Sequence, residues 1–299
     1  MTVATATGTG AGTETGRPVG RTKRRRSKRN YWLSALAIVL SIVVFVVPFL
    51  FMVVNAAKTR QEAAEFSFSW PAQLQFVQNF QDVISARDYM LVIAFINSSI
   101  LTVASVAILV VLSAMVAYIL QRRKNRWTTV VNFLVLAGLI IPPAVVPTIW
   151  VLEAMGLFRT MPGLILVEVA FGISFCILLF RAFIATIPRD IDEAATIDGA
   201  SPLRLFFRVI FPLLRSVAIT VIVVQSVNIF NDFQNPLYFL PGDDNATVQL
   251  TVYNFSGQFQ SQYNLLFMDI LLITIPPLIM FLFFNRQIVA GMTAGGVKG

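Results

Sequence analysis

Amide side chains recur at every third position near the end of one long apolar run. At this spacing Gln225, Asn228 and Asn231 fall broadly on one face of a helix. Amide groups donate hydrogen bonds to hydroxyl groups and accept them, so the cluster could line a path for a hydroxyl-rich solute. Hydrogen bonding between membrane helices explains it equally well. Asp232 and Gln234 lie nearby, and Phe230, Tyr238 and Phe239 could supply apolar faces.

Ionisable residues also interrupt the apolar runs, at Glu168, Arg181, Asp232 and Asp269. They are functional candidates because a charge in hydrocarbon is costly unless it faces protein or water. Arg181 is close enough to the end of its run to extend into the interface, and the three acids are also near the ends of theirs. Exposure at the membrane surface is therefore the simple alternative to proton or cation coupling.

Several kinds of enzyme chemistry are excluded. The chain has no histidine and one cysteine, Cys176, so it holds no Ser-His or Cys-His nucleophile, no histidine-based zinc site and no internal disulfide. It also lacks the Gly-x4-Gly-Lys-[Ser/Thr] loop that binds nucleotide phosphates. We therefore expect no catalytic residues, metal or cofactor, and any ATP hydrolysis must occur on a separate subunit.

The elements that position these residues are apolar and long. Hydrophobic residues make up 57% of the chain and charged residues 13%, far from the balance of a soluble domain. Runs of the length needed to cross a bilayer recur along it. The sequence predicts an all-α integral membrane protein with six spans, over 33–54, 90–120, 127–152, 163–183, 209–233 and 265–285. Prolines at 142, 143, 147, 276 and 277 are expected to kink the third and sixth spans, whether or not the kinks shape a cavity or gate.

The net charge of +8 is distributed unevenly. Basic residues concentrate in 17–29, 122–126 and 181–215, and Arg286 and Lys298 follow near the end. The alternate connections are sparse, with Lys58, Arg60 and Arg87 in the first, Arg159 in the second and none in 236–264. By the positive-inside rule, both termini are expected in the cytoplasm of a protein of the cell membrane. This distribution argues against nucleic-acid binding.

Three segments are expected from composition. Residues 1–30 are a polar, basic N-terminal tail that we expect to be disordered. Residues 31–286 form the membrane domain, and 287–299 form a cytoplasmic tail. A basic stretch before an apolar one also suggests a signal peptide, but the 33–54 run exceeds a typical signal core, which favours an uncleaved first span.

Segment 188–212, between the fourth and fifth spans, has the pattern of a helix, a break and a second helix. An acidic first turn follows Pro188, and Asp198-Gly199 supplies a stop. Ser201-Pro202 suits the N-cap and first position of a second helix, which runs on into the fifth span. Such a segment either anchors a loop at the membrane surface or docks on a soluble partner.

The same segment carries a family resemblance. The run Glu193-Ala194-Ala195, followed by Gly199 and Pro212 at spacings of four and thirteen, resembles the Glu-Ala-Ala loop of binding-protein-dependent ATP-binding cassette permeases. The resemblance extends over about 33–299 and indicates the branch similar to the smaller permease subunit of maltose-type systems. Its other motifs are Pro142-Pro143, Gly156-Leu157, Gly163-Leu164, Asn231-Asp232-Phe233, Pro236-Leu237 and the tail 291–299.

The resemblance implies a type I importer fold with a cytoplasmic coupling helix, and a sugar or oligosaccharide substrate. It implies four partners: a second permease subunit, an ATPase dimer, an extracytoplasmic solute-binding protein and the bilayer. The implied ATPase-coupling residues are Glu193, Ala194, Ala195, Asp198, Gly199, Leu203, Phe206 and Pro212, where Leu203 and Phe206 would pack in the ATPase cleft or against the membrane domain. Tail residues Thr293, Gly295 and Lys298 would contact the ATPase subunits. The alternative is an ion-coupled transporter or channel that uses Glu168 or Asp269.

Overall fold

The computed structural model describes residues 31–242, 245–256 and 261–296. The predicted N-terminal tail, 1–30, lies outside them. The chain divides into two compact units, residues 1–47 and 48–299, with the boundary at Pro48 inside the first helix. Over the described ranges the secondary structure is helical, apart from one isolated bridge between Ser256 and Ser261.

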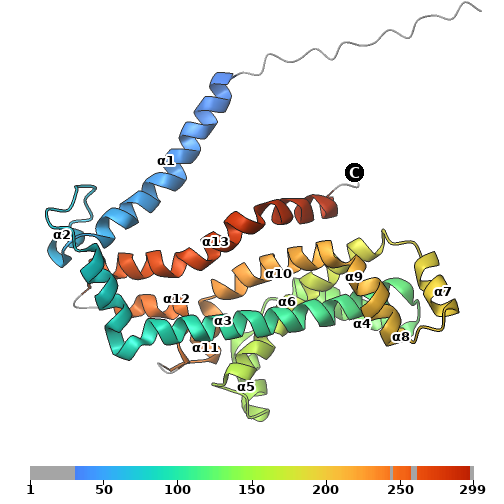
Figure 1. The fold of residues 1–299 in the computed structure, drawn as a ribbon. Coiled ribbons are helices and arrows are strands. Elements are labelled where there is room, and N and C mark those ends of the chain that lie inside the picture. The colour runs from blue at the N-terminus through green and yellow to red at the C-terminus, as the bar shows by residue number, and fades with distance from the viewer. Residues whose placement is uncertain (1–30, 243–244, 257–260, 297–299) are drawn as a thin grey trace, which may run out of the picture. The chain divides into compact units, whose positions relative to one another are not determined.

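The helices follow one another as shown in Figure 1. They are α1 (Tyr31–Ala56), α2 (Arg60–Ala64), α3 (Phe76–Arg122), α4 (Arg126–Ile140), α5 (Val145–Ala154), α6 (Met161–Ile184), α7 (Asp190–Ile197), α8 (Pro202–Leu205), a π-helical turn (Phe206–Ile210), α9 (Phe211–Leu213), α10 (Arg215–Phe230), α11 (Gln234–Phe239), α12 (Val248–Thr251), a 3-10 turn (Val252–Asn254) and α13 (Tyr263–Gly296).

Four helices within the described residues are long and apolar enough to cross a membrane, and a bent pair makes a fifth. The four lie at Ser34–Ala56, Phe76–Arg122, Met161–Ile184 and Tyr263–Phe284. They match the first, second, fourth and sixth predicted spans. The chain is therefore a multi-pass membrane protein.

The third predicted span, 127–152, is broken into the two shorter helices α4 and α5. The break falls at Pro142-Pro143. Ile141, which precedes the first proline, has an extended backbone (φ −77°, ψ 119°), as expected because a proline ring disfavours the helical region for the residue before it. By contrast, α13 is one helix through Pro276 and Pro277, and it runs on to Gly296.

The predicted start of the fifth span was wrong, and the helix of the second span reaches further back than the predicted span. The fifth was expected to begin at Val209, but α10 begins at Arg215 and is bent by 76° from the helical segment Pro202–Leu213. The second extends back to Phe76, although Arg87, Asp88 and Tyr89 leave the helical conformation with positive φ. The continuously helical part begins at Met90, where the span was predicted to start.

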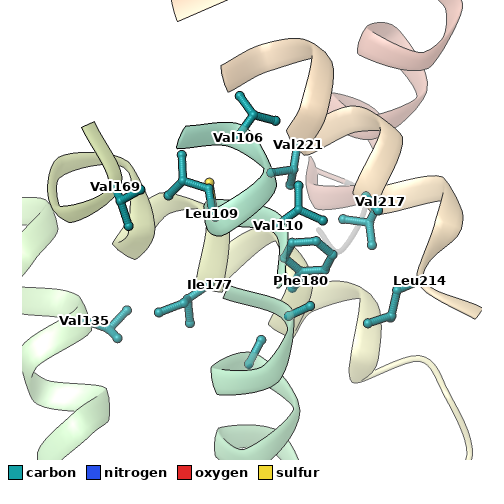
Figure 2. Packing of buried hydrophobic residues seen from close by; sticks show 14 of the residues in the cluster. Val106, Leu109, Val110, Val135, Val169, Ile177, Phe180, Leu214, Val217 and Val221 are labelled. Atoms are coloured by element: carbon teal, nitrogen blue, oxygen red, sulfur yellow. The ribbon is translucent and has the colours of Figure 1, made fainter. Parts of the chain in front are cut away.

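The larger core lies among α3, α6 and α10. Figure 2 shows the Phe180 ring of α6 close to Val110 of α3, with Val217 and Leu214 on its α10 side; all four are buried. Helices in a bilayer gain little from leaving lipid, so close packing and hydrogen bonds hold such a core together. At Gly138 of α4, an added Cβ would lie 2.6 Å from the Ser174 hydroxyl of α6, so these two helices approach closely.

The connection between α1 and α3 is fixed by polar contacts. Lys58 is fully buried, and its Nζ donates to the Ser67 carbonyl at 2.6 Å. The Glu62 carboxylate accepts from the Ala72 backbone N–H at 3.0 Å and from Thr59 in a capping box. These backbone hydrogen bonds, that of Ala72 first, lower the pKa of Glu62, because they favour the charged form.

Candidate functional site

The helices α7 and α8, called here the helix pair, are separated by a break at 198–201, as the sequence predicted. The Gly199 N–H donates to the Thr196 carbonyl and the Ala200 N–H to the Ala195 carbonyl, both at 3.0 Å, which together form a Schellman motif. Gly199 has φ +78°, the left-handed conformation that this motif requires. Ser201 caps α8 by accepting from the Arg204 N–H.

The beginning of α7 follows the predicted charge pattern but starts two residues late. Pro188 was expected in the first turn, whereas α7 begins at Asp190. Asp190, Asp192 and Glu193 occupy that first turn, where negative charge is favourable because the helix dipole is positive there.

The helix pair presents side chains to the surroundings. No residue of α7 is buried: Glu193 and Ala194 are exposed, Ala195 is half-buried, and Ile197 is 85% exposed. Asp198, which follows α7, is also exposed. Figure 1 shows the pair at one end of the unit 48–299, beside the end of α3. A short helix with this exposure can be contacted by another protein without unfolding anything.

Phe206 and Leu203, each expected to pack in the ATPase cleft or against the membrane domain, differ in their exposure. Phe206 is 4% exposed and lies against the Tyr118 ring at a centroid distance of 5.7 Å, within the membrane domain. Leu203 is 63% exposed. Pro212, also exposed, follows the π-helical turn; it has no N–H to continue the helical hydrogen bonds, and the 76° bend comes directly after it.

Asp192 joins the helix pair to α3. The Tyr118 hydroxyl donates to Asp192 Oδ1 at 2.5 Å, and Arg122 Nη2 lies 2.9 Å from Asp192 Oδ2. Arg122 Nη2 also donates to the Ile187 carbonyl at 3.1 Å. The Asp192 and Arg122 side chains are only 16% and 12% exposed, so solvent screens this ion pair less than a surface pair. A displacement of α7 is therefore opposed by α3.

A second feature is a groove on α6 and α10 with a volume of about 350 Å³, called here the polar groove. Its polar side chains are Glu168, Gln225, Asn228 and Asp232. Its other lining residues are Phe171, Gly172, Phe175, Val224 and Ile229. Hydrogen-bonding groups beside aromatic faces suit a ligand with hydroxyl groups and apolar C–H faces.

The predicted amide cluster is only partly brought together. Gln225 and Asn228 line the groove, and Gln225 is buried with its Nε2 donating to Cys176 Sγ at 3.2 Å. Asn231 lies outside the lining and accepts from Gln249 Nε2 at 3.2 Å. Gln234 is exposed, and its backbone N–H donates to Asp232 Oδ1 at 2.8 Å.

The aromatic residues of the groove were not those expected. Phe230 and Phe239 are buried elsewhere and Tyr238 is outside the lining, whereas Phe171 and Phe175 contribute the rings. The sequence did hold a signal for them: Glu168, Phe171 and Phe175 recur at helical spacing on one face of the fourth predicted span.

The other ionisable candidates have hydrogen bonds with neutral side chains, and Glu168 also interacts with the carboxyl group of Asp232. Glu168 is buried and accepts from Asn235 Nδ2 at 3.1 Å. Asp269 is fully buried and accepts from the Thr251 hydroxyl at 3.0 and 3.2 Å. Arg181 is half-buried and donates to Gln121 and Asn132. Of the predicted tail contacts, Thr293 and Gly295 fall within the α13 backbone, and Lys298 lies outside the described residues.

Curated proteins match most of the chain. It is 30% identical over 258 residues to the melibiose/raffinose/stachyose import permease protein of Bacillus subtilis, which covers 85% of this chain and 91% of that protein. It is 32% identical over 256 residues to a probable starch degradation products transport system permease protein of Thermoanaerobacterium thermosulfurigenes, with coverage of 85% and 92%. It is 31% identical over 254 residues to the diacetylchitobiose uptake system permease protein of Streptomyces coelicolor, with coverage of 84% and 83%.

The fold is also that of a solved permease. A crystal structure of a bacterial ABC transporter that imports the acidic polysaccharide alginate superposes with a TM-score of 0.74. It is 18% identical and covers 87% of this chain and 98% of its own.

A family model covers the helix pair, the polar groove and most of the membrane domain. The model for binding-protein-dependent transport system inner membrane components matches residues 110–293. This match and the curated relatives confirm the resemblance noted in the sequence. The chain belongs to the family of binding-protein-dependent transport system inner membrane components, and it is a membrane permease of that family.

Proposed function

We propose that this permease imports sugars or oligosaccharides as one half of an ATP-driven complex, and that the helix pair receives the movement of the ATPase. The complex would contain a second permease subunit, an ATPase dimer and an extracytoplasmic solute-binding protein. The observation that carries the proposal is the helix pair itself: a capped, exposed helix that an ion pair fixes to α3.

The assignment of residues within the helix pair follows their exposure. Glu193, Ala194 and Ala195 form the docking surface with Ile197 and Leu203, while Asp198 and Gly199 set the turn between the helices. Phe206 and Pro212 act from the membrane side, at the start and end of the turn that leads into α10. Thr293, Gly295 and Lys298 are proposed as additional ATPase contacts.

A sugar substrate is supported by two observations. The three relatives described above are named as permeases for melibiose, raffinose and stachyose, for starch degradation products, and for diacetylchitobiose. The polar groove offers amides and aromatic rings of the kind that contact sugars. The groove is lined by α6, α10 and Asp232, which follows α10, so the second permease subunit would supply the other wall of the path.

The basic connection between α3 and α4 supports an orientation. Arg122, Arg123, Lys124 and Arg126 cluster there, at the same end of the unit as the helix pair. The positive-inside rule assigns this end to the cytoplasm, where ATP is available, and both termini to the same side of the cell membrane.

The test is uptake of labelled oligosaccharides by the assembled complex in proteoliposomes. Glu193→Lys and Gly199→Pro should abolish both uptake and substrate-stimulated ATP hydrolysis while the complex still assembles. Glu153→Lys is the matched control, because it reverses an exposed charge of α5, outside the helix pair. Normal transport by both helix-pair variants, or solute movement by the isolated chain without ATPase, would contradict the proposal.

A further inference from the structure

A strongly basic cleft lies where α3 and α6 end and α4 begins. It has a volume of about 590 Å³, and its lining includes four cationic side chains, Arg123, Lys124, Arg181 and Arg189. The remaining lining residues are uncharged, so the cleft carries a formal charge of +4. Within the described residues, none of these four cations forms an ion pair; the Arg122–Asp192 pair lies outside the lining. We call this feature the basic cleft.

Arg181 of α6 is held in a defined position in the basic cleft. Its Nε donates to Gln121 Oε1 at 3.2 Å, and its Nη1 donates to Asn132 Oδ1. Both acceptors are neutral amides, so they orient the guanidinium without neutralising it. These contacts use two of the five N–H donors of the guanidinium. Arg181 is therefore fixed and half-buried, and its positive charge has no acidic partner in the cleft. This arrangement suits the binding of an anion.

The first turn of α4 adds to the same field. Thr128 and Thr129 line the basic cleft, and α4 is a helix of 15 residues whose N-cap is Asn125. The positive end of a helix dipole favours negative charge, and phosphate groups are common ligands there.

An exposed tryptophan supports a position of the basic cleft near the lipid headgroups. Trp127, which follows the connection directly, is 66% exposed, and tryptophan at such a position is typical of the membrane interface. Beyond it the exposed apolar side chains of Val130, Phe133 and Leu134 continue along α4 as a surface for acyl chains. A general excess of positive charge would explain the number of basic residues here, but not an oriented arginine among them.

We propose that the basic cleft binds the phosphate group of an anionic ligand. Anionic phospholipids of the adjacent leaflet carry such a group at this depth, and soluble phosphate esters carry it in the aqueous phase. Basic pockets between membrane helices are suited to lipid phosphates because charge attraction and a bilayer anchor act together. The function would be to fix the α3–α4 connection beside the helix pair.

The experiment uses the assembled complex, stripped of lipid in detergent. Phosphatidylglycerol or phosphatidylcholine with the same acyl chains is then added, and native mass spectrometry measures how much of each lipid stays bound. Phosphatidylglycerol should be retained selectively, and its affinity should fall about fivefold for each charge removed by Arg181→Gln or Lys124→Gln. Arg208→Gln is the matched control, since it removes an exposed charge outside the basic cleft. Lys124 is exposed on the connection, so its replacement leaves the fold intact.

A second arm distinguishes the sources of phosphate. Inorganic phosphate and glycerol phosphate are titrated into the lipid-free complex, and thermal stabilisation is measured for the same variants. If a soluble phosphate binds and Arg181→Gln abolishes that binding, the cleft takes a soluble ligand. If phosphatidylglycerol is retained selectively and no soluble phosphate binds, the ligand is a lipid headgroup. The proposal is overturned if both lipids are retained equally and neither phosphate binds, or if Arg208→Gln weakens binding as much as Arg181→Gln. The proposal is also overturned if Arg181→Gln releases the ATPase subunit while lipid and phosphate binding stay unchanged, because the cleft would then contact a protein. None of these readouts depends on the transported solute.

Discussion

Asp192 contacts α3 through both of its carboxylate oxygens. One oxygen accepts from Tyr118 and the other pairs with Arg122, a turn further along α3. Because α3 packs against α6, α10 and α13, a force on α7 that passes through Asp192 reaches most of the membrane domain. Glu193, by contrast, is exposed. The two neighbouring acids therefore have different proposed roles, one inside the protein and one toward the ATPase.

Asp192→Asn should uncouple ATP hydrolysis from transport. The amide keeps one acceptor oxygen for Tyr118 but loses the charge that pairs with Arg122, so α7 should move without displacing α3. We expect the number of sugars transported per ATP to fall severalfold while the complex remains assembled. With Arg122→Gln, a double-mutant cycle on unfolding should give a coupling energy of about 0.5–3 kcal/mol.

Asp190→Asn is the control for this variant, because Asp190 is an exposed acid of the same helical turn. It should leave the transport ratio unchanged. Equal loss in the two variants would show that general negative charge at the start of α7 matters, rather than the contact with α3.

Asn228 is the exposed amide of the polar groove, whereas Gln225 is buried. If the groove lines the sugar path, Asn228→Leu should slow uptake by roughly twofold to tenfold, the equivalent of one hydrogen bond of about 0.5–1.5 kcal/mol. The stimulation of the ATPase by the binding protein should be preserved. Uptake rates in proteoliposomes measure the effect. Tyr238→Phe, which removes a hydroxyl outside the groove, should transport normally; a similar loss there would remove the argument for the groove.

The helix pair depends on one backbone conformation at its turn. Gly199 and Gly156 both have positive φ, and an added Cβ at either position would meet no atom within 4 Å. Alanine at each should therefore cost about 1–2 kcal/mol from backbone strain alone. Only Gly199→Ala should also increase hydrogen exchange at the Ala200 N–H and lower coupling to ATP hydrolysis. If Gly156→Ala impairs coupling equally, strain anywhere in the chain suffices and the turn has no special role.

This turn was predictable from the sequence because its determinants act locally. Gly199, Ser201 and Pro202 each impose a conformation on their own backbone or cap the next few residues. The start of the fifth span was not predictable in the same way. The apolar run continues through Val209 and Phe211, so the mean hydropathy of the run gives no sign of the 76° bend near Leu214.

Contacts between distant segments were the least predictable. Asp192 pairs with Arg122, seventy residues away, and the sequence carries no signal that selects this partner. Likewise, Gln225, Asn228 and Asn231 share a helical spacing, but α10 ends at Phe230, where Asn231 leaves the helix. The groove instead combines two of these amides with Phe171 and Phe175 of α6, because packing between helices decides which faces meet.

At the scale of the whole molecule, the clustered basic residues lie apart from the two buried acids. Clustered cations lie near the helix pair, at one end of the unit 48–299, while Glu168 and Asp269 are buried within α6 and α13. In an ATP-driven permease neither acid is needed for energy coupling, since the energy enters at the helix pair. In an ion-coupled carrier the same acids would have to bind or release the coupling ion. The two mechanisms therefore predict opposite results for a single protein.

The double variant Glu168→Gln/Asp269→Asn should retain ATP-driven uptake within about threefold of the unmodified complex. Glutamine can still accept from Asn235 and asparagine from Thr251, so these two hydrogen bonds survive while the titratable groups at positions 168 and 269 are lost. Uptake is measured with ATP inside the proteoliposomes and no ion gradient, then with a proton or sodium gradient and no ATP. The unmodified protein should transport only in the first condition. Gradient-driven uptake that disappears in the double variant would assign energy coupling to the buried acids and reject the helix pair as the point where energy enters.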